Sequence, residues 1–320
     1  MPYEHVPVLL EPALSALDVK PDGIYVDGTF GRGGHSRAIL DRLGTHGRLY
    51  ALDCDPQAVA CARELESVER RFTLTRARFS TLGERCTEWG IAGKVDGVLL
   101  DIGVSSPQLD DPARGFSFEH DGPLDMRMDF ENGMSAAELV NSSPRNILKQ
   151  IFRDYGEENF AGKVASAIVR ERERKPFTRT GELAALIERT IPGRNVGKHK
   201  ATRCFQALRI AVNGELEELQ MALKSAVEVL APDGVLAVIS FHSLEDRLVK
   251  RFMQEQSAGE RVPAALPLTF EQTESLRLNS ATLGAVAAPV KADEAELTAN
   301  PRARSATLRS ARRLARSLTS

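Results

Sequence analysis

The stretch Ile24-Tyr-Val-Asp-Gly-Thr-Phe-Gly-Arg-Gly-Gly-His-Ser36 decides the fold of this chain. A short β-prone run ends in the acid Asp27, four glycines follow, and an apolar-periodic segment begins near His35. This order predicts a strand, a glycine turn and a helix, which form the first unit of a nucleotide-binding α/β sheet. The glycines allow positive φ angles and let the backbone approach a ligand closely.

The loop itself favours one ligand over another. A dinucleotide-binding loop follows G-x-G-x-x-G, and Gly31 and Gly33 fit it, but Ser36 stands where the third glycine is expected. A strand-end acid followed directly by a glycine turn is typical of S-adenosylmethionine sites, because that ligand has an ammonium group to hold and no pyrophosphate. A glycine-rich turn without any ligand is the third interpretation, and the glycine density argues against it.

A second acid lies about 20 residues past the glycine loop, at the end of the β-prone run 48–52. At this distance Asp53 is placed to accept hydrogen bonds from ribose hydroxyls, in NAD sites and in S-adenosylmethionine sites alike. Its alternative role is to cap the next helix, but Asp55 directly precedes Pro56 and suits that role better. Phe79, in the loop after the third strand, is either a face for an adenine or a buried loop aromatic.

The fourth strand carries a third acid. The apolar run 95–100 predicts a strand buried on both faces, and it ends in Asp101. Ligands of open α/β sheets bind beyond the carboxyl ends of the strands, so Asp27, Asp53 and Asp101 predict one ligand site. The following turn, Ser105-Ser106-Pro107-Gln108, partly matches the Ser/Asp/Asn-Pro-Pro-aromatic turn with which methyltransferases hold exocyclic amines. It lacks the second proline and the aromatic residue.

Several segments together resemble one family, the bacterial small-subunit ribosomal RNA cytosine-N4 methyltransferases of the MraW type. They are the opening His5-Val-Pro-Val-Leu-Leu, the stretch 26–36, and the segments 101–110, 115–118, 121–129, 207–213, 240–247 and 300–305. The match covers nearly the whole chain, although 255–292 departs from the pattern.

The resemblance implies a class I methyltransferase fold, S-adenosylmethionine as methyl donor, and a cytidine in the decoding region of 16S ribosomal RNA as target. Carried over by motif, the cofactor contacts are Gly33, Gly34, His35, Asp53, Phe79, Asp101 and Gln108. Ser105, Ser106 and Pro107 are the catalytic candidates, placed to hold the target amine.

The Rossmann-like order breaks after the fourth strand. Four helical patterns follow, the first preceded by Ser135 and Glu138 at capping-box spacing, and no strand-like run appears before residue 214. We therefore expect an α/β, Rossmann-like methyltransferase sheet in residues 1–108 and 214–320, with an all-helical substrate domain inserted at 109–213. The alternation in 306–311 predicts a closing antiparallel strand whose arginines face RNA.

Local charge is more informative than net charge. The net charge is −2, so any nucleic-acid surface must be local. In 170–175 bases alternate with glutamates, which favours a solvated helix face. The run 194–203 contains bases and no acid, so RNA contact and a solvated surface are equally open there.

The cysteine spacing and the length of the apolar runs indicate which other classes of protein are not expected. The four cysteines form no C-x-x-C pair, which favours free intracellular thiols and no metal site. No apolar run reaches the roughly 20 residues that span a bilayer, and the first residues do not resemble a secretory signal. We expect a cytoplasmic protein without a membrane partner; a homodimer is compatible with the sequence, which does not determine the oligomeric state.

Transfer of a methyl group from S-adenosylmethionine to cytidine N4 in 16S ribosomal RNA of the small subunit is thus the expected function. Three alternatives stay open at this point. A nicotinamide dehydrogenase would share Asp53 but needs the missing glycine. A small-molecule methyltransferase has little use for a basic insertion, and a non-enzymatic ribosome assembly factor has no need of three strand-end acids.

Overall fold

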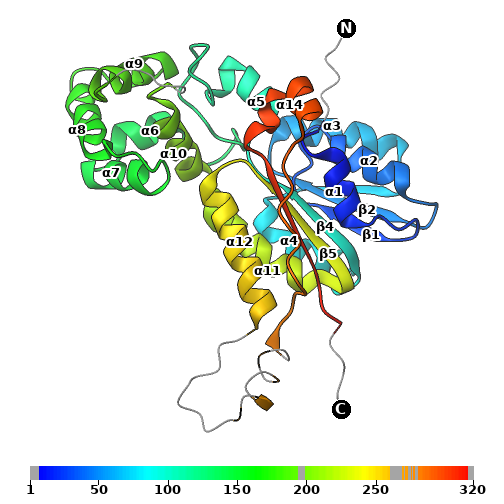
Figure 1. Ribbon diagram of the computed structural model, residues 1–320. Helices are drawn as coiled ribbons and strands as arrows, with labels where there is room; N and C mark the ends of the chain where they lie inside the picture. The colour runs from blue at the N-terminus through cyan, green and yellow to red at the C-terminus, as the bar shows by residue number, and fades with distance from the viewer. Residues whose placement is uncertain are drawn as a thin grey trace. The chain divides into compact units, whose positions relative to one another are not determined.

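The computed structural model describes residues 7–193, 199–259 and 280–315, together with 269, 271, 272, 275 and 277. Its chain divides into two compact units (Figure 1). Unit 1 comprises Met1–Gly103 and Glu217–Ser320, and unit 2 comprises Val104–Leu216. These limits lie a few residues outside the 109–213 insertion that the sequence predicts.

Unit 1 is built on a six-stranded sheet in the order β3-β2-β1-β4-β5-β6, whose first five strands run parallel. The register pairs Asp27 with Ala51 and Leu99, so Asp53 and Asp101 each lie two residues beyond a partner of Asp27. The three strand-end acids therefore share one edge of the sheet. The strands are β1 (Ile24–Asp27), β2 (Arg48–Asp53), β3 (Phe72–Arg76), β4 (Val95–Asp101), β5 (Leu230–Ser240) and β6 (Thr307–Arg312).

Helices cover both faces of this sheet, because successive strand side chains point to opposite sides. Leu99 packs in one apolar core and Leu100 in the other. The first core holds α1 (Leu10–Leu17), α2 (Gly34–Arg42) and α3 (Pro56–Val68); the second holds α4 (Leu82–Glu88), α11 (Glu215–Val229) and α12 (Ser243–Ala258). The short elements are η1 (Phe79–Thr81), α14 (Glu294–Ala299) and η3 (Pro301–Ser305).

Unit 2 is helical, and its described residues contain no strand beyond an isolated bridge between Pro123 and Arg179. Ser135 and Glu138 form the predicted capping box at the start of α6. The elements are α5 (Ser106–Asp110), η2 (Pro112–Arg114), α6 (Ala136–Ser142), α7 (Arg145–Asp154), α8 (Ala161–Arg172), α9 (Thr180–Thr190) and α10 (Thr202–Asn213). Among the described residues of both units, no helix combines the length and the apolar character that crossing a membrane requires.

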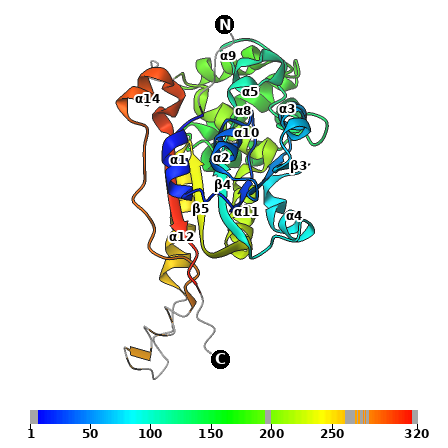
Figure 2. The ribbon, with the colours of Figure 1, turned by 90° about the vertical axis from the view of Figure 1, so that its right-hand side faces the viewer.

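The closing strand β6 runs antiparallel to β5, as the sequence predicts (Figure 2). The expectation that its arginines face RNA is wrong for Arg309, whereas the Arg312 side chain is half exposed and its contact with RNA stays a prediction. Arg309 forms a bidentate pair with Asp246 of α12, at 2.7 and 3.0 Å, and only 11% of its side chain is exposed. Arg312 pairs with Asp18 at 3.1 Å. These arginines attach the edge strand to neighbouring elements.

Arg309→Ala should therefore destabilise the fold. The variant leaves the Asp246 carboxylate without its charged donor, so we expect the free energy of unfolding to fall by about 1–3 kcal/mol. Denaturant unfolding followed by circular dichroism measures this change. The exposed Arg304 on η3 supplies the control, and Arg304→Ala should stay within about 0.5 kcal/mol of the parent. Equal stability of the two variants would contradict a structural role for the Arg309–Asp246 pair.

Candidate functional site

The glycine loop between β1 and α2 has a conformation that only glycine adopts readily. Gly31 and Gly33 have φ angles of 57° and 76°. A Cβ on Gly33 would lie 2.5 Å from Cζ of Phe30, and one on Gly34 would lie 2.2 Å from Cγ of Pro7. Both predicted cofactor contacts, Gly33 and Gly34, are thus required by packing, and their contact with a cofactor stays a prediction.

Asp27 stabilises this loop through two hydrogen bonds. Its side chain is buried; Oδ1 accepts a hydrogen bond from the Thr29 backbone N–H at 3.0 Å, and Oδ2 accepts one from the Ser36 hydroxyl at 2.6 Å. Burial raises the pKa of Asp27, while the Ser36 and Thr29 hydrogen bonds oppose that rise. The acid therefore connects the end of β1 to the first turn of α2. The Ser36 that breaks the dinucleotide pattern is its partner.

Asp53 connects β2 to the same loop. Oδ2 accepts from the Gly31 N–H and Oδ1 from the Asp55 N–H, both at 2.8 Å. Desolvation raises the pKa of Asp53 to about 6, against the lowering effect of these two N–H donors. Asp55 caps α3 by accepting from the Gln57 N–H at 2.9 Å, which confirms its predicted role. A carboxylate has about four acceptor positions, so Asp53 can still accept from two ribose hydroxyls.

Asp101 is the acid with an unsatisfied oxygen. Its Oδ2 lies 3.5 Å from Nδ1 of His35, whereas its buried Oδ1 has no hydrogen-bond partner in the described part of the chain. Nε2 of His35 lies 3.1 Å from the Val8 carbonyl oxygen, so this nitrogen carries the proton. Desolvation and the Asp27 and Glu245 carboxylates raise the pKa of Asp101 well above its usual value. A buried orphan acceptor at the end of β4 suits a ligand that donates there.

Taken together, the three carboxylates make the edge electronegative. The charge of Asp27 contributes to the raised pKa of both Asp53 and Asp101, so the structure brings these two acids within electrostatic reach of Asp27. Such an edge attracts a cation and repels a pyrophosphate. S-adenosylmethionine carries a sulfonium and an ammonium group, whereas NAD carries a pyrophosphate; the geometry therefore fits the former and disfavours the dehydrogenase alternative.

Two further side chains of unit 1 follow the carboxyl ends of strands, Phe79 after β3 and His242 after β5. Phe79, the first residue of η1, is half-buried and packs against the second core, so both of its predicted roles remain compatible with the structure. His242 caps α12: its Nδ1 accepts from the Glu245 N–H at 3.4 Å, and its Nε2 lies 3.0 Å from Oε1 of Glu245. These contacts give His242 a structural role at the end of β5.

The predicted amine-binding turn belongs to unit 2. Ser105 is the N-cap of α5, and its backbone N–H donates to Oε1 of Gln108 at 2.8 Å, as in a capping box. Gln108 and Ser106 are both buried, and Ser106 precedes Pro107 in the first turn of α5. Gln108 thus shapes the turn, and its assignment to the cofactor stays a prediction. The spacing of Ser105 and Gln108 could have revealed this cap from the sequence.

Sequence reasoning also missed Thr29. Its hydroxyl accepts a hydrogen bond from the Asp101 N–H at 2.7 Å, while its own N–H donates to Asp27. Thr29 therefore joins the ends of β1 and β4 through hydrogen bonds to Asp27 and Asp101. No sequence spacing signals this contact, because it links residues 72 positions apart.

Several solved structures are similar to this chain at low identity and low TM-score. The chain is similar to an rRNA methylase of Streptococcus thermophilus, at 10% identity and a TM-score of 0.41 over 97% of this chain and 98% of that one. It is similar to TrmN from Thermus thermophilus, at 13% identity and a TM-score of 0.43 over 96% and 48% of the two chains. Fibrillarin from Aeropyrum pernix, with bound S-adenosyl-L-methionine, matches at 11% identity and a TM-score of 0.37 over 94% and 73%.

The sequence of the chain also matches a known protein family. The MraW methylase family matches residues 2–314, which is nearly the whole chain and includes both units. The strand-end acids, the glycine loop and the turn after β4 all lie within this match. The chain therefore belongs to the MraW methylase family and is an S-adenosylmethionine-dependent rRNA methyltransferase.

Proposed function

We propose that this protein transfers the methyl group of S-adenosylmethionine to the N4 amine of a cytidine in the decoding region of 16S ribosomal RNA, in the cytoplasm. The observation that carries the proposal is the family match over residues 2–314, joined to a sheet edge of three carboxylates that suits a cationic methyl donor. The motifs that resemble cytosine-N4 methyltransferases supply the choice of atom and RNA. The helical residues 109–213 are proposed as the substrate domain.

The proposed cofactor site uses the chain's own residues in distinct roles. Asp53 would accept from the ribose hydroxyls, and Asp101 would offer its unsatisfied Oδ1 to a donor group of the cofactor. Phe79 would cover the adenine, and Gly33, Gly34 and His35 would shape the loop around the ligand. When bound, S-adenosylmethionine supplies an activated methyl on a sulfonium, so the protein need not create a strong electrophile.

The chemical difficulty then lies with the target amine. The lone pair of cytosine N4 is delocalised into the ring, so a hydrogen bond accepted from the amine favours the pyramidal geometry that exposes the lone pair. We assign this role to the turn of Ser105, Ser106 and Pro107. Asp101 and Ser105 are four residues apart, so the turn starts within about 14 Å of the end of β4. The base must leave its stack to be methylated.

The reaction itself tests the proposal. Purified protein is incubated with S-adenosylmethionine and small ribosomal subunits lacking the modification, and the RNA is digested to nucleosides for mass spectrometry. We expect N4-methylcytidine, mapped by nuclease fragments to the decoding region. A methyl group on a carbon or a ribose oxygen, or transfer only to a region remote from decoding, would refute the proposed specificity and leave the methyltransferase assignment intact.

Asp53 should make cofactor binding depend on pH. Its pKa of about 6 means that acidification from pH 7.5 to 5.5 protonates the ribose acceptor, so cofactor affinity should fall. Protein stability moves oppositely, because a carboxyl whose folded pKa is raised adds stability as the pH falls through that value. At pH 7.5 Asp53→Asn should weaken binding by about 1.5–3 kcal/mol, and its affinity should vary less with pH.

Calorimetric titration with S-adenosylmethionine at both pH values measures these effects. Asp41→Asn, an exposed acid on α2, is the matched control and should bind like the parent. If folded Asp53→Asn retains the parental dissociation constant at pH 7.5, Asp53 does not contact the cofactor.

The buried Ser106 should act on the chemical step. Ser106→Ala is expected to keep its affinity for S-adenosylmethionine and to slow single-turnover methylation by about tenfold to a thousandfold, the worth of one transition-state contact. Ser105→Ala is the comparison, since the structure makes Ser105 the helix cap. Parental single-turnover rates for both variants, singly and combined, would show that this turn does not hold the amine.

A further inference from the structure

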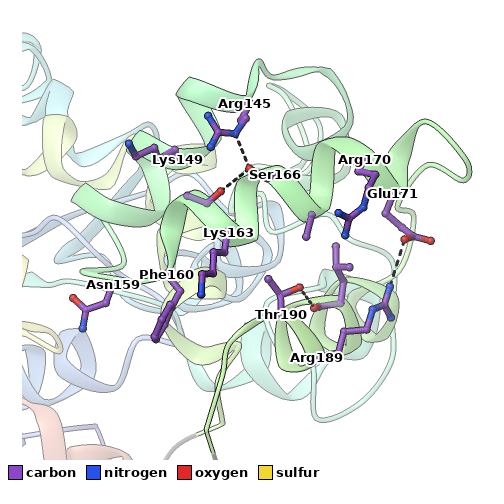
Figure 3. Close-up of a pocket in the computed structure, with 13 residues that line it drawn as sticks. Arg145, Lys149, Asn159, Phe160, Lys163, Ser166, Arg170, Glu171, Arg189 and Thr190 are labelled. Atoms are coloured by element: carbon purple, nitrogen blue, oxygen red, sulfur yellow. Dashed lines mark hydrogen bonds and ion pairs between the residues drawn. The ribbon is translucent and has the colours of Figure 1, made fainter.

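A basic hollow lies on unit 2, lined mainly by side chains of the helices α7, α8 and α9 (Figure 3). It has a volume of about 850 Å³. Five bases line it, all of them exposed, and Glu171 is the one acid in its lining. The bases are Arg145 and Lys149 of α7, Lys163 and Arg170 of α8, and Arg189 of α9. We call this set the basic hollow.

Helical periodicity explains why these bases face one way. Arg145 and Lys149 are four residues apart and Lys163 and Arg170 are seven apart, spacings that put side chains on one helix face. The opposite faces of the same helices are buried in the core of unit 2, through residues such as Leu148, Val164, Ile168, Leu183 and Ile187. The core thereby fixes the bases on the solvent side.

The charge of the hollow is largely uncompensated. Within the described ranges, neither Lys149 nor Arg170 forms an ion pair. Arg145 donates from Nε to the Ser166 hydroxyl at 2.6 Å, and Arg189 lies 3.7 Å from Glu171. Elsewhere on unit 2, some exposed bases do pair with acids: Arg153 with Asp154, and Lys175 with Glu182.

An aromatic side chain completes the lining. Phe160 is half-buried, and Nζ of Lys163 lies 5.3 Å from its ring centroid. The hydroxyl groups of Ser166 and Thr190 and the amide of Asn159 also line the hollow (Figure 3). Bases, hydroxyls and an amide contact phosphates, and an aromatic face next to bases is a platform for a nucleobase.

We propose that the basic hollow binds the phosphate backbone of the RNA substrate, apart from the target cytidine. This inference rests on the proposed function for its choice of RNA. Lys163 and Arg170 are about 10 Å apart along α8, at 1.5 Å per residue, so α8 alone can reach more than one phosphate. An acidic protein is the competing occupant, but the half-buried Phe160 and the planar arginines favour a nucleic acid.

The runs singled out in the sequence contribute less to such a surface. In the run 170–175, Arg172 donates to the Val140 and Ser143 carbonyls, and Arg170 is the one base of the run that lines the hollow. In the run 194–203, residues 194–198 lie outside the described residues. Lys200 donates to the Ile191 carbonyl and Arg203 to the Glu157 carbonyl. The predicted bases are thus partly engaged by the fold itself.

The test compares two double variants of the full-length protein that remove the same charge. Lys149→Ala/Arg170→Ala removes two bases from the hollow, and Arg70→Ala/Lys94→Ala removes two exposed bases from unit 1. Binding of a fluorescent 16S ribosomal RNA fragment that contains the decoding region is followed by anisotropy across a salt series. S-adenosylmethionine affinity, measured by calorimetry, confirms that each variant is folded.

The hollow variant should bind the RNA at least tenfold more weakly, and the slope of log K against log salt should flatten by about 1.4–1.8, the worth of two phosphate contacts. The control should keep the parental slope. Equal slopes for all three proteins, or equal losses in both variants, would overturn the proposal. So would a polyglutamate probe that binds the parent more tightly than the RNA and is lost in the hollow variant.

These outcomes are separable from the proposed function. N4-methylcytidine formation by the parent protein tests the reaction, and the salt slope tests the hollow. Parental methylation with an unchanged slope in the hollow variant rejects the hollow alone, whereas a flattened slope without N4-methylcytidine supports the hollow and rejects the choice of target.

Discussion

Three like charges at one sheet edge are the constraint around which unit 1 is built. Burial removes hydration from Asp27, Asp53 and Asp101 and raises the pKa of each carboxyl, and the charge of Asp27 adds to the rise at Asp53 and at Asp101. Charge-assisted hydrogen bonds from the Gly31 N–H and the Ser36 hydroxyl offset part of that cost. The rest is uncompensated at Asp101, whose Oδ1 has no partner among the described residues. A cationic ligand removes this imbalance, so the edge is arranged for binding at some expense of stability.

The same contacts explain which residues the glycine loop contains. Gly31 presents its N–H to Asp53 at a positive φ, and Gly34 leaves room for Pro7. Ser36, which spoils a dinucleotide pattern, is the hydroxyl that binds Asp27. Ser36 therefore replaces the third glycine of a dinucleotide-binding loop, and its hydroxyl holds the strand-end acid Asp27 in place. The loop is shaped by the acids before any ligand arrives.

How far the sequence predicts this molecule depends on whether a feature is local. The strand-end acids, the glycine turn, the Asp55 cap and the antiparallel β6 were predictable because each is encoded within a few residues or by strand order. Features joining distant segments were not. The Arg309–Asp246 pair spans 63 positions, and the alternation of β6 says nothing about what its arginines contact. The cap that Gln108 forms with Ser105 is local, by contrast, and its spacing is visible in the sequence, while the contact of Gln108 with a cofactor stays a prediction.

The basic hollow is likewise a feature that the sequence alone does not predict, because it joins distant segments. Compact runs of bases attract attention in a sequence, yet a run on one helix points its members in different directions, and several bind carbonyls of their own unit, as Arg172 does. Bases scattered over three helices converge when the cores of those helices pack, and their common face is then the one that the core leaves to solvent. Because two of these bases lack acidic partners among the described residues, their charge is available to a polyanion without breaking an existing ion pair. Binding there would consequently gain Coulomb energy and counterion release at little cost to the fold.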